Sequence, residues 1–183
     1  MNKQSDAKFS VVIIQNKLRI FYFVAYLVVL VIADTLIHET GHYLAALVIG
    51  VPANEIKFRF VTLSPEITIP SRFNNNISLT FYHYVGGIFA AIVLLVVYLL
   101  FWYRKYRVNP TGLFWALGFA TILLCGEEVG NAIYEGGFHG AYMHYINSPF
   151  SIIDLLILSC VLMGFVVHLK LFPLSKVKRK GST

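Results

Sequence analysis

The sequence has few charged residues and few cysteines. Only 13% of its 183 residues are charged, against about 25% in soluble domains, whereas 57% are hydrophobic. An ordinary soluble globule could not bury so much apolar surface, so that class is disfavoured. Cys125 and Cys160 lie far apart in apolar runs and form no CxxC pair. Neither a disulfide framework nor a cysteine-based zinc site is therefore indicated.

The net charge of +6 does not indicate a nucleic-acid partner. Lys and Arg form short clusters beside apolar runs instead of a stripe with interleaved aromatic residues. Four lie in segment 1–19, three in 104–107 and five at the C-terminal end, whereas 51–78 has three and 135–149 has none. Because positive charge is retained on the cytoplasmic side, we expect both termini to be cytoplasmic.

Four apolar stretches predict an all-α integral membrane protein with about four transmembrane helices. They cover about 18–50, 79–103, 111–135 and 152–172, and each is long enough to cross a hydrocarbon core of roughly 30 Å. As one helix the first would be roughly 50 Å long, so it must tilt, kink or divide. We expect residues 1–183 to form a single membrane-embedded domain in a lipid bilayer. Nothing in the sequence indicates an oligomeric state.

The segment near residues 55–70 has a different composition. It reads EIKFRFVTLSPEITIP, in which β-branched and aromatic residues alternate in part with polar ones. Gly50 and Pro52 come before it and are expected to end the first helix. The pattern predicts a short β-hairpin or an interfacial strand pair.

The motif HETGH, His38 to His42, lies inside the first apolar stretch. Two histidines four residues apart project from one face of a helix and can bind one metal ion, with Glu39 beside them. The motif predicts a zinc site in which Glu39 takes a proton from water and later passes it to a leaving amine. The alternative is an inward-facing hydrogen-bonded cluster without metal. Ionisable groups near a membrane centre each cost about 2.5–3.5 kcal/mol and are usually retained there for a function.

Other acidic residues can support this site. Asp34 precedes His38 by four residues, so it either accepts the second N–H of that imidazole or makes a simple interior polar contact. Glu127 and Glu128 follow on the third stretch and read as a carboxylate pair that faces a polar interior. Glu128 is also a candidate third metal ligand, because glutamate has that role in many soluble zinc proteases.

The run HETGHYLAALVIGV, residues 38–51, resembles the HExGH helix of site-2-protease-type intramembrane zinc metalloproteases. The order of a zinc helix, a strand-rich segment, a span that opens with Gly86 and Gly87, and a later polar helix with an Asn is similar to compact members. The two glycines would let another helix approach closely. The resemblance implies one zinc ion per chain, peptide-bond hydrolysis in membrane-protein or peptide substrates, and a substrate-positioning role for Asn131.

The resemblance also implies an Asp as third metal ligand, but the corresponding position is Ala141, which cannot bind metal. His139 and His144 flank this position, and either can be a ligand or an ordinary interfacial histidine. The alternative function is therefore a catalytically inactive relative that acts as a membrane subunit or binding partner and retains the metal. An ion transporter would need polar residues on several spans, and only the first and third supply them.

Overall fold

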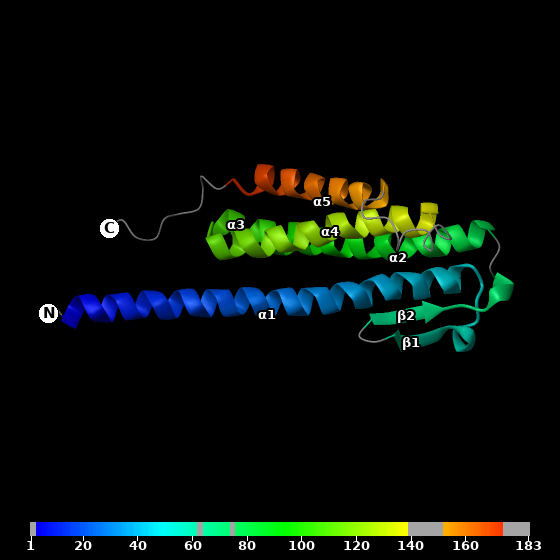
Figure 1. Ribbon diagram of the computed structural model, residues 1–183, viewed down its shortest axis with the longest axis horizontal. Coiled ribbons are helices and arrows are strands. Elements are labelled where there is room, and N and C mark those ends of the chain that lie inside the picture. The colour runs from blue at the N-terminus through cyan, green and yellow to red at the C-terminus, as the bar shows by residue number, and fades with distance from the viewer. Residues whose placement is uncertain (1–2, 62–63, 74–75, 139–151, 174–183) are drawn as a thin grey trace.

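The computed structural model describes residues 3–61, 64–73, 76–138 and 152–173. Most of this part of the chain is helical, and a small two-stranded sheet follows the first helix (Figure 1). The predicted helical class and the predicted strand segment are both confirmed. The four long helices of the described part are α1, Lys3–Val48; α2, Asn76–Val97; α4, Gly112–Phe138; and α5, Ile152–Leu171.

The second apolar stretch continues beyond α2 without a break. A π-helical segment, Tyr98–Tyr103, joins α2 to the short helix α3, Arg104–Val108. The continuous apolar helix therefore runs from Thr80 to Val108 and ends among basic residues.

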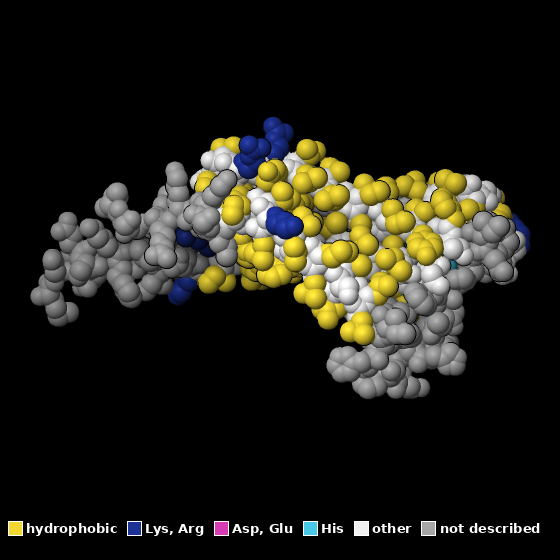
Figure 2. Space-filling model, turned by 90° about the horizontal axis from the view of Figure 1, so that it is seen from above, with side chains coloured by type: hydrophobic (Ala, Val, Ile, Leu, Met, Phe, Trp, Pro, Cys, Tyr) yellow, Lys and Arg dark blue, Asp and Glu magenta, His cyan; other side chains and the backbone are white. Residues whose placement is uncertain are grey.

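Three helical stretches are long and apolar enough to cross a membrane, namely Lys17–Val48, Thr80–Val108 and Gly112–Gly137. The apolar part of α5, Leu155–Leu171, is shorter. Many large apolar side chains of α1 face outward; Val29, for example, is 63% exposed. Hydrophobic side chains cover much of the described surface in Figure 2, with Lys and Arg mostly toward the end where α3 lies. These features suggest a membrane protein.

The helices pack side by side in the order α1, α2, α4, α5. Glycines allow α2 to approach both of its neighbours. A Cβ atom on Gly41 of α1 would lie 2.9 Å from the Cα atom of Gly86, and one on Gly87 would lie 2.7 Å from the backbone nitrogen of Ala132 in α4. Neither position has room for a larger residue, which agrees with the close approach expected from the sequence.

A glycine ends α1 as expected. Gly50 has a φ of 91°, a left-handed conformation that glycine adopts without steric cost. Val51 N–H donates to the carbonyl of Ala46 at 3.0 Å, and Gly50 N–H donates to that of Leu47 at 3.1 Å. This pair of bonds is the Schellman arrangement, which satisfies the last carbonyls of a helix and turns the chain away from its axis.

The chain then forms an antiparallel hairpin from β1, Lys57–Val61, and β2, Ser64–Thr68. In this register Phe58 lies opposite Ile67, and Arg59 lies opposite Glu66. Since alternate residues of a strand point to opposite faces, one face of the hairpin is apolar and the other is charged. The hairpin lies beside the C-terminal part of α1 (Figure 1).

A small apolar cluster fixes this end of the molecule. Ala45 and Ala46 of α1, Val51 after it, and Tyr82 of α2 are all buried together. The segments that flank the hairpin pack on the same cluster through Ile56 and other apolar residues. The hairpin is therefore held against the same helical turns that carry the HETGH motif.

Candidate metal centre

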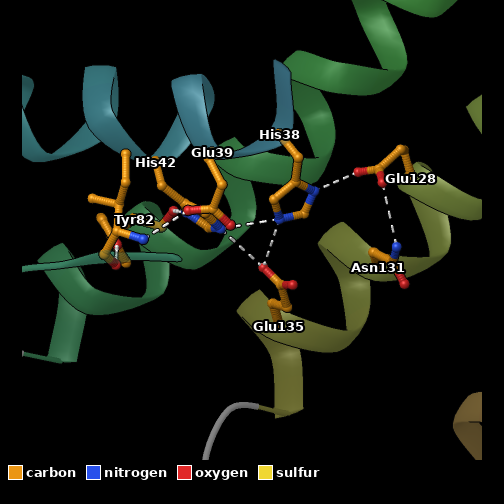
Figure 3. A network of polar contacts seen from close by, with 8 residues as sticks. His38, Glu39, His42, Tyr82, Glu128, Asn131 and Glu135 are labelled. Atoms are coloured by element: carbon orange, nitrogen blue, oxygen red, sulfur yellow. Dashed lines mark hydrogen bonds and ion pairs between the residues drawn. The ribbon is translucent and has the colours of Figure 1, made fainter. Parts of the chain in front are cut away.

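Three ligand atoms from two helices converge at one point. The Nε2 atoms of His38 and His42 in α1 are 3.1 Å apart, and Oε2 of Glu135 in α4 lies 3.4 Å from the first and 3.2 Å from the second (Figure 3). A tetrahedral zinc ion with bonds of about 2.0–2.1 Å holds its ligands about 3.3 Å apart. The three atoms therefore already have the spacing of a metal site, and the group could hold a metal ion.

The second nitrogen of each imidazole is held by an acceptor. His42 Nδ1 lies 2.9 Å from the carbonyl oxygen of Tyr82, and His38 Nδ1 lies 2.6 Å from Oε2 of Glu128. A carbonyl can only accept, so the hydrogen-bond network assigns the proton of His42 to Nδ1. Both contacts are the kind that orient metal-binding histidines and leave Nε2 with its lone pair.

With Nδ1–H tautomers, the centre brings three lone pairs face to face. Oε2 of Glu135 is buried and receives no hydrogen bond from the described residues, although both Nε2 atoms are near. Such an arrangement is unfavourable unless a metal ion, or a proton on one of the two Nε2 atoms, lies among the three atoms. The chemistry of the donor set therefore fits a metal ion.

Gly86 of α2 leaves the space that an ion needs. A Cβ atom at this position would lie 2.4 Å from Nε2 of His42 and 2.9 Å from Nε2 of His38. Any side chain here would occupy the place where the two ligand nitrogens meet. The closely packed helix crossing and the open metal position thus depend on the same residue.

Glu39 lies at the boundary between α1 and the hairpin. Its Oε2 accepts a hydrogen bond from the backbone N–H of Ile67 at 2.8 Å, and the carbonyl of Ile67 accepts one from the Tyr82 hydroxyl at 2.6 Å. The outward edge of β2 is therefore bonded to the residues around the metal centre. Glu39 is half-buried and remains the carboxylate next in sequence to a ligand histidine.

The other candidates from α1 and α4 occupy different places. Asp34 is buried one turn before His38, but its Oδ1 has no hydrogen-bond partner in the described residues. Glu128 lies at the Nδ1 side of His38, away from the three converging ligand atoms, so it holds a ligand in place. Asn131 donates weakly to the other oxygen of Glu128 at 3.5 Å. The positions His139, Ala141 and His144 lie outside the described residues.

Glu135 was not singled out in the sequence. The signal that could have found it is spacing, because Glu128, Asn131 and Glu135 follow an i, i+3, i+7 pattern on an otherwise apolar helix. That pattern places all three on one face of α4, toward α1. The described residues thus define a two-histidine, one-carboxylate centre inside an apolar helix bundle.

Comparisons with known proteins identify no relative: no family model matches the chain, and no curated protein or solved structure matches it. Function is therefore inferred from the site itself.

Proposed function

We propose that this protein is an intramembrane zinc metalloprotease that hydrolyses peptide bonds of membrane-protein substrates. One observation carries the proposal. Two imidazole nitrogens and one carboxylate oxygen converge within 3.4 Å of one another, and Glu39 directly follows the first ligand in the chain. Two histidines and a glutamate are also the ligands of well-known soluble zinc proteases, in which a glutamate between the histidines is the general base.

Zinc is the metal we assign. Two nitrogens and one oxygen also suit iron or cobalt, so the donor set alone does not choose among them. The base beside the ligands favours hydrolysis over redox chemistry, and zinc has no redox chemistry of its own. When bound, zinc supplies a Lewis acid that polarises a peptide carbonyl and makes water a stronger acid.

Glu39 moves the proton in this proposal. As water adds to the carbonyl carbon, Glu39 accepts one of its protons, and it then delivers that proton to the amide nitrogen as the C–N bond breaks. The second proton of the water passes from the new carboxyl group to the amine, so the products are a carboxylate and an ammonium group, and atoms and charge balance. Glu128 and the Tyr82 carbonyl keep the imidazoles of His38 and His42 in the orientation that the reaction needs.

The substrate proposed is a polypeptide segment that reaches the bundle from the bilayer. The apolar outer surface of α1 and the exposed side chain of Phe60 on the hairpin both suit contact with lipid. The hairpin also offers an edge to which an unwound segment can add as a strand, since the edge of β1 away from β2 pairs with no described strand. Asn131 lies on the metal-facing side of α4 and is assigned to substrate positioning.

The alternative function is an inactive relative that keeps the metal and acts as a membrane subunit or binding partner. The sequence suggests this alternative because Ala141 stands where a third metal ligand is expected. The carboxylate of Glu135 can take the place of that ligand. One observation favours it, however: the Ile67 N–H occupies the carboxylate of Glu39. An active enzyme must use the other oxygen, Oε1, or free Oε2 when substrate binds.

The experiment compares the wild-type chain with Glu39→Gln and with the double variant His38→Ala/His42→Ala. Each is purified in detergent, its metal content is measured by elemental mass spectrometry, and cleavage is assayed on a set of membrane-spanning reporter segments. We expect near one zinc per wild-type and Glu39→Gln chain, none in the double variant, and cleavage by the wild type alone. Zinc-loaded wild type with no cleavage on any reporter would support the inactive relative, whereas absence of zinc would overturn the metal centre.

A further inference from the structure

A cavity of about 280 Å³ lies between α1 and the hairpin, next to the metal centre. The carboxylate of Glu39 forms part of its wall. The remaining lining residues are apolar or weakly polar. Helix α1 contributes Leu36, Thr40 and Tyr43, and the hairpin region contributes Ile56, just before β1, Phe58 of β1 and Ile67 of β2. The mechanism described above leaves this cavity without a role.

Glu39 lines the cavity and is also the proposed proton carrier, so the cavity lies next to the place where the peptide bond would be cleaved. The same side chain lies between the cavity and the ligand histidines, because His38 and His42 flank it on α1. A peptide group that is to exchange a proton with Glu39 must lie within hydrogen-bond reach of it. The side chain next to that peptide group then lies a few ångströms away, at the entrance of the cavity.

The cavity can be reached from the lipid side. Leu36 is 45% exposed, and Thr40, one turn further along α1, is exposed as well. Besides Glu39, the lining residues of α1 are Leu36, Thr40 and Tyr43, which follow at i, i+4 and i+7 and form one stripe along the helix. A segment lying in the bilayer can therefore insert a side chain between α1 and the hairpin without crossing the bundle.

Size and lining define the occupant. The cavity lies at the lower end of the roughly 300–1,000 Å³ of small-ligand pockets, so it has room for one large side chain. Besides the hydroxyl groups of Thr40 and Tyr43, its lining has one carboxylate, that of Glu39, which already receives a hydrogen bond from Ile67. An acidic substrate side chain would be repelled by the carboxylate of Glu39 here and would lose its hydration.

We infer that this cavity is a specificity subsite that takes one large apolar side chain, such as Leu, Met or Phe, from the residue adjoining the scissile peptide bond. This inference rests on the proposed protease function and adds its selectivity. Leu36 and Phe58 determine the preference, because they are the apolar lining residues that α1 and β1 contribute.

The test uses full-length zinc-loaded protein and reporter segments that differ in one residue on either side of the cleavage site. The variant Leu36→Trp fills the cavity, and Phe58→Ala enlarges it. The matched control is Val29→Trp, because Val29 lies seven residues before Leu36 on the same face of α1, is 63% exposed, and does not line the cavity. Zinc content of every variant checks that the fold is retained.

Wild type should prefer Leu or Phe over Ala and Asp at one of the two positions. One missing methylene in an apolar pocket changes kcat/KM by about 10–200-fold, so Leu36→Trp should lower cleavage of the Leu and Phe reporters at least 10-fold relative to the Ala reporter. The variant Phe58→Ala should move the preference toward larger residues, and Val29→Trp should match wild type. If the wild type cleaves the reporters but neither Leu36→Trp nor Phe58→Ala changes the residue preference, the subsite is overturned while the protease function stands. Zinc-loaded wild type that cleaves no reporter would overturn the protease function and the subsite with it.

Discussion

His38 Nδ1 and Glu128 Oε2 lie 2.6 Å apart, although 90 residues separate them in the chain. This contact joins α1 to α4 at the same level as the metal centre, where Glu135 of α4 meets the Nε2 atom of the same imidazole. The ring of His38 thus lies between two carboxylates of one helix, with one near each of its nitrogens. Glu128 contacts Nδ1 of His38 and Glu135 lies near Nε2, so substitution of each carboxylate should have a different effect on metal binding.

Substitution of Glu135 should weaken metal binding more than substitution of Glu128. Glu135→Gln removes a charged ligand, whereas Glu128→Gln leaves all three ligand atoms and weakens only the orientation of His38. Residues that hydrogen-bond to a metal ligand typically contribute 10–100-fold to metal affinity. The variant Glu128→Gln should therefore lower zinc affinity by about 10–100-fold, and Glu135→Gln should lower it further. Zinc affinity is measured by competition with a chromophoric chelator. Glu66→Gln is the control, because Glu66 is exposed on the hairpin. The reverse order would make Glu128 the ligand.

A single methyl group at position 86 should abolish metal binding. The Cβ atom of Gly86→Ala would meet both ligand nitrogens at distances that real Cβ atoms do not show. We expect at least about a tenfold loss of zinc per chain, since ligand geometry must stay within about 0.2 Å for binding. The control is Gly112→Ala at the start of α4, where a Cβ atom meets nothing within 4 Å. Full zinc content in the Gly86→Ala protein would contradict the placement of the ion.

Local sequence patterns determined those parts of the fold that depend on near neighbours. The end of α1 at Gly50, the hairpin after it, and the pair His38 and His42 each follow from spacing within a few residues. Spacing places Glu135 on the same face of α4 as Glu128 and Asn131, but it does not show that Glu135 is the one that meets the histidines. Its role depends on which face of α4 packs toward α1, and that in turn depends on how α2 fits between other helices. Acidic residues on α4 were visible, but only the packing shows which of them reaches the Nε2 atoms.

The hairpin register specifies which proline substitutions test strand addition. Pro65 has no N–H, and the N–H and C=O of Ile67 bond outside the sheet, so the pairs Phe60–Pro65 and Phe58–Ile67 are the non-hydrogen-bonded ones. The backbone groups of Phe60 therefore face the free edge of β1, whereas those of Arg59 face β2. Proline at Arg59 or Lys57 would break the hairpin itself and is not a selective test.

We expect Phe60→Pro to lower reporter cleavage about tenfold while zinc content stays unchanged, because it removes one backbone donor from the edge that a substrate strand would use. Phe60→Ala separates the backbone effect from the loss of the aromatic ring, which is 68% exposed, and should retain most activity. Equal activity of the proline and alanine variants would exclude strand addition at this edge.

The proposed orientation places the hairpin and the metal centre toward the side of the membrane opposite the cytoplasm. The basic residues of α3 and the end of α5 lie at one end of the bundle, and the hairpin lies at the other (Figure 1). Since Lys and Arg near span ends favour the cytoplasmic side, exposed residues of the hairpin should be accessible from outside the cell. The chain offers a clean background for cysteine labelling, because Cys125 and Cys160 are both buried.

Intact cells that produce Glu66→Cys should therefore react with a membrane-impermeant maleimide, whereas cells that produce Arg107→Cys should react only after lysis. Both positions are exposed in the structure, so a difference in labelling reports the side of the membrane and not burial. Wild-type protein should stay unlabelled in both conditions. The opposite result, with Arg107→Cys labelled in intact cells, would reverse the orientation. The proposed catalytic base and the proposed apolar subsite would then open toward the cytoplasmic half of the bilayer, and substrates would have to present their cleavage sites there.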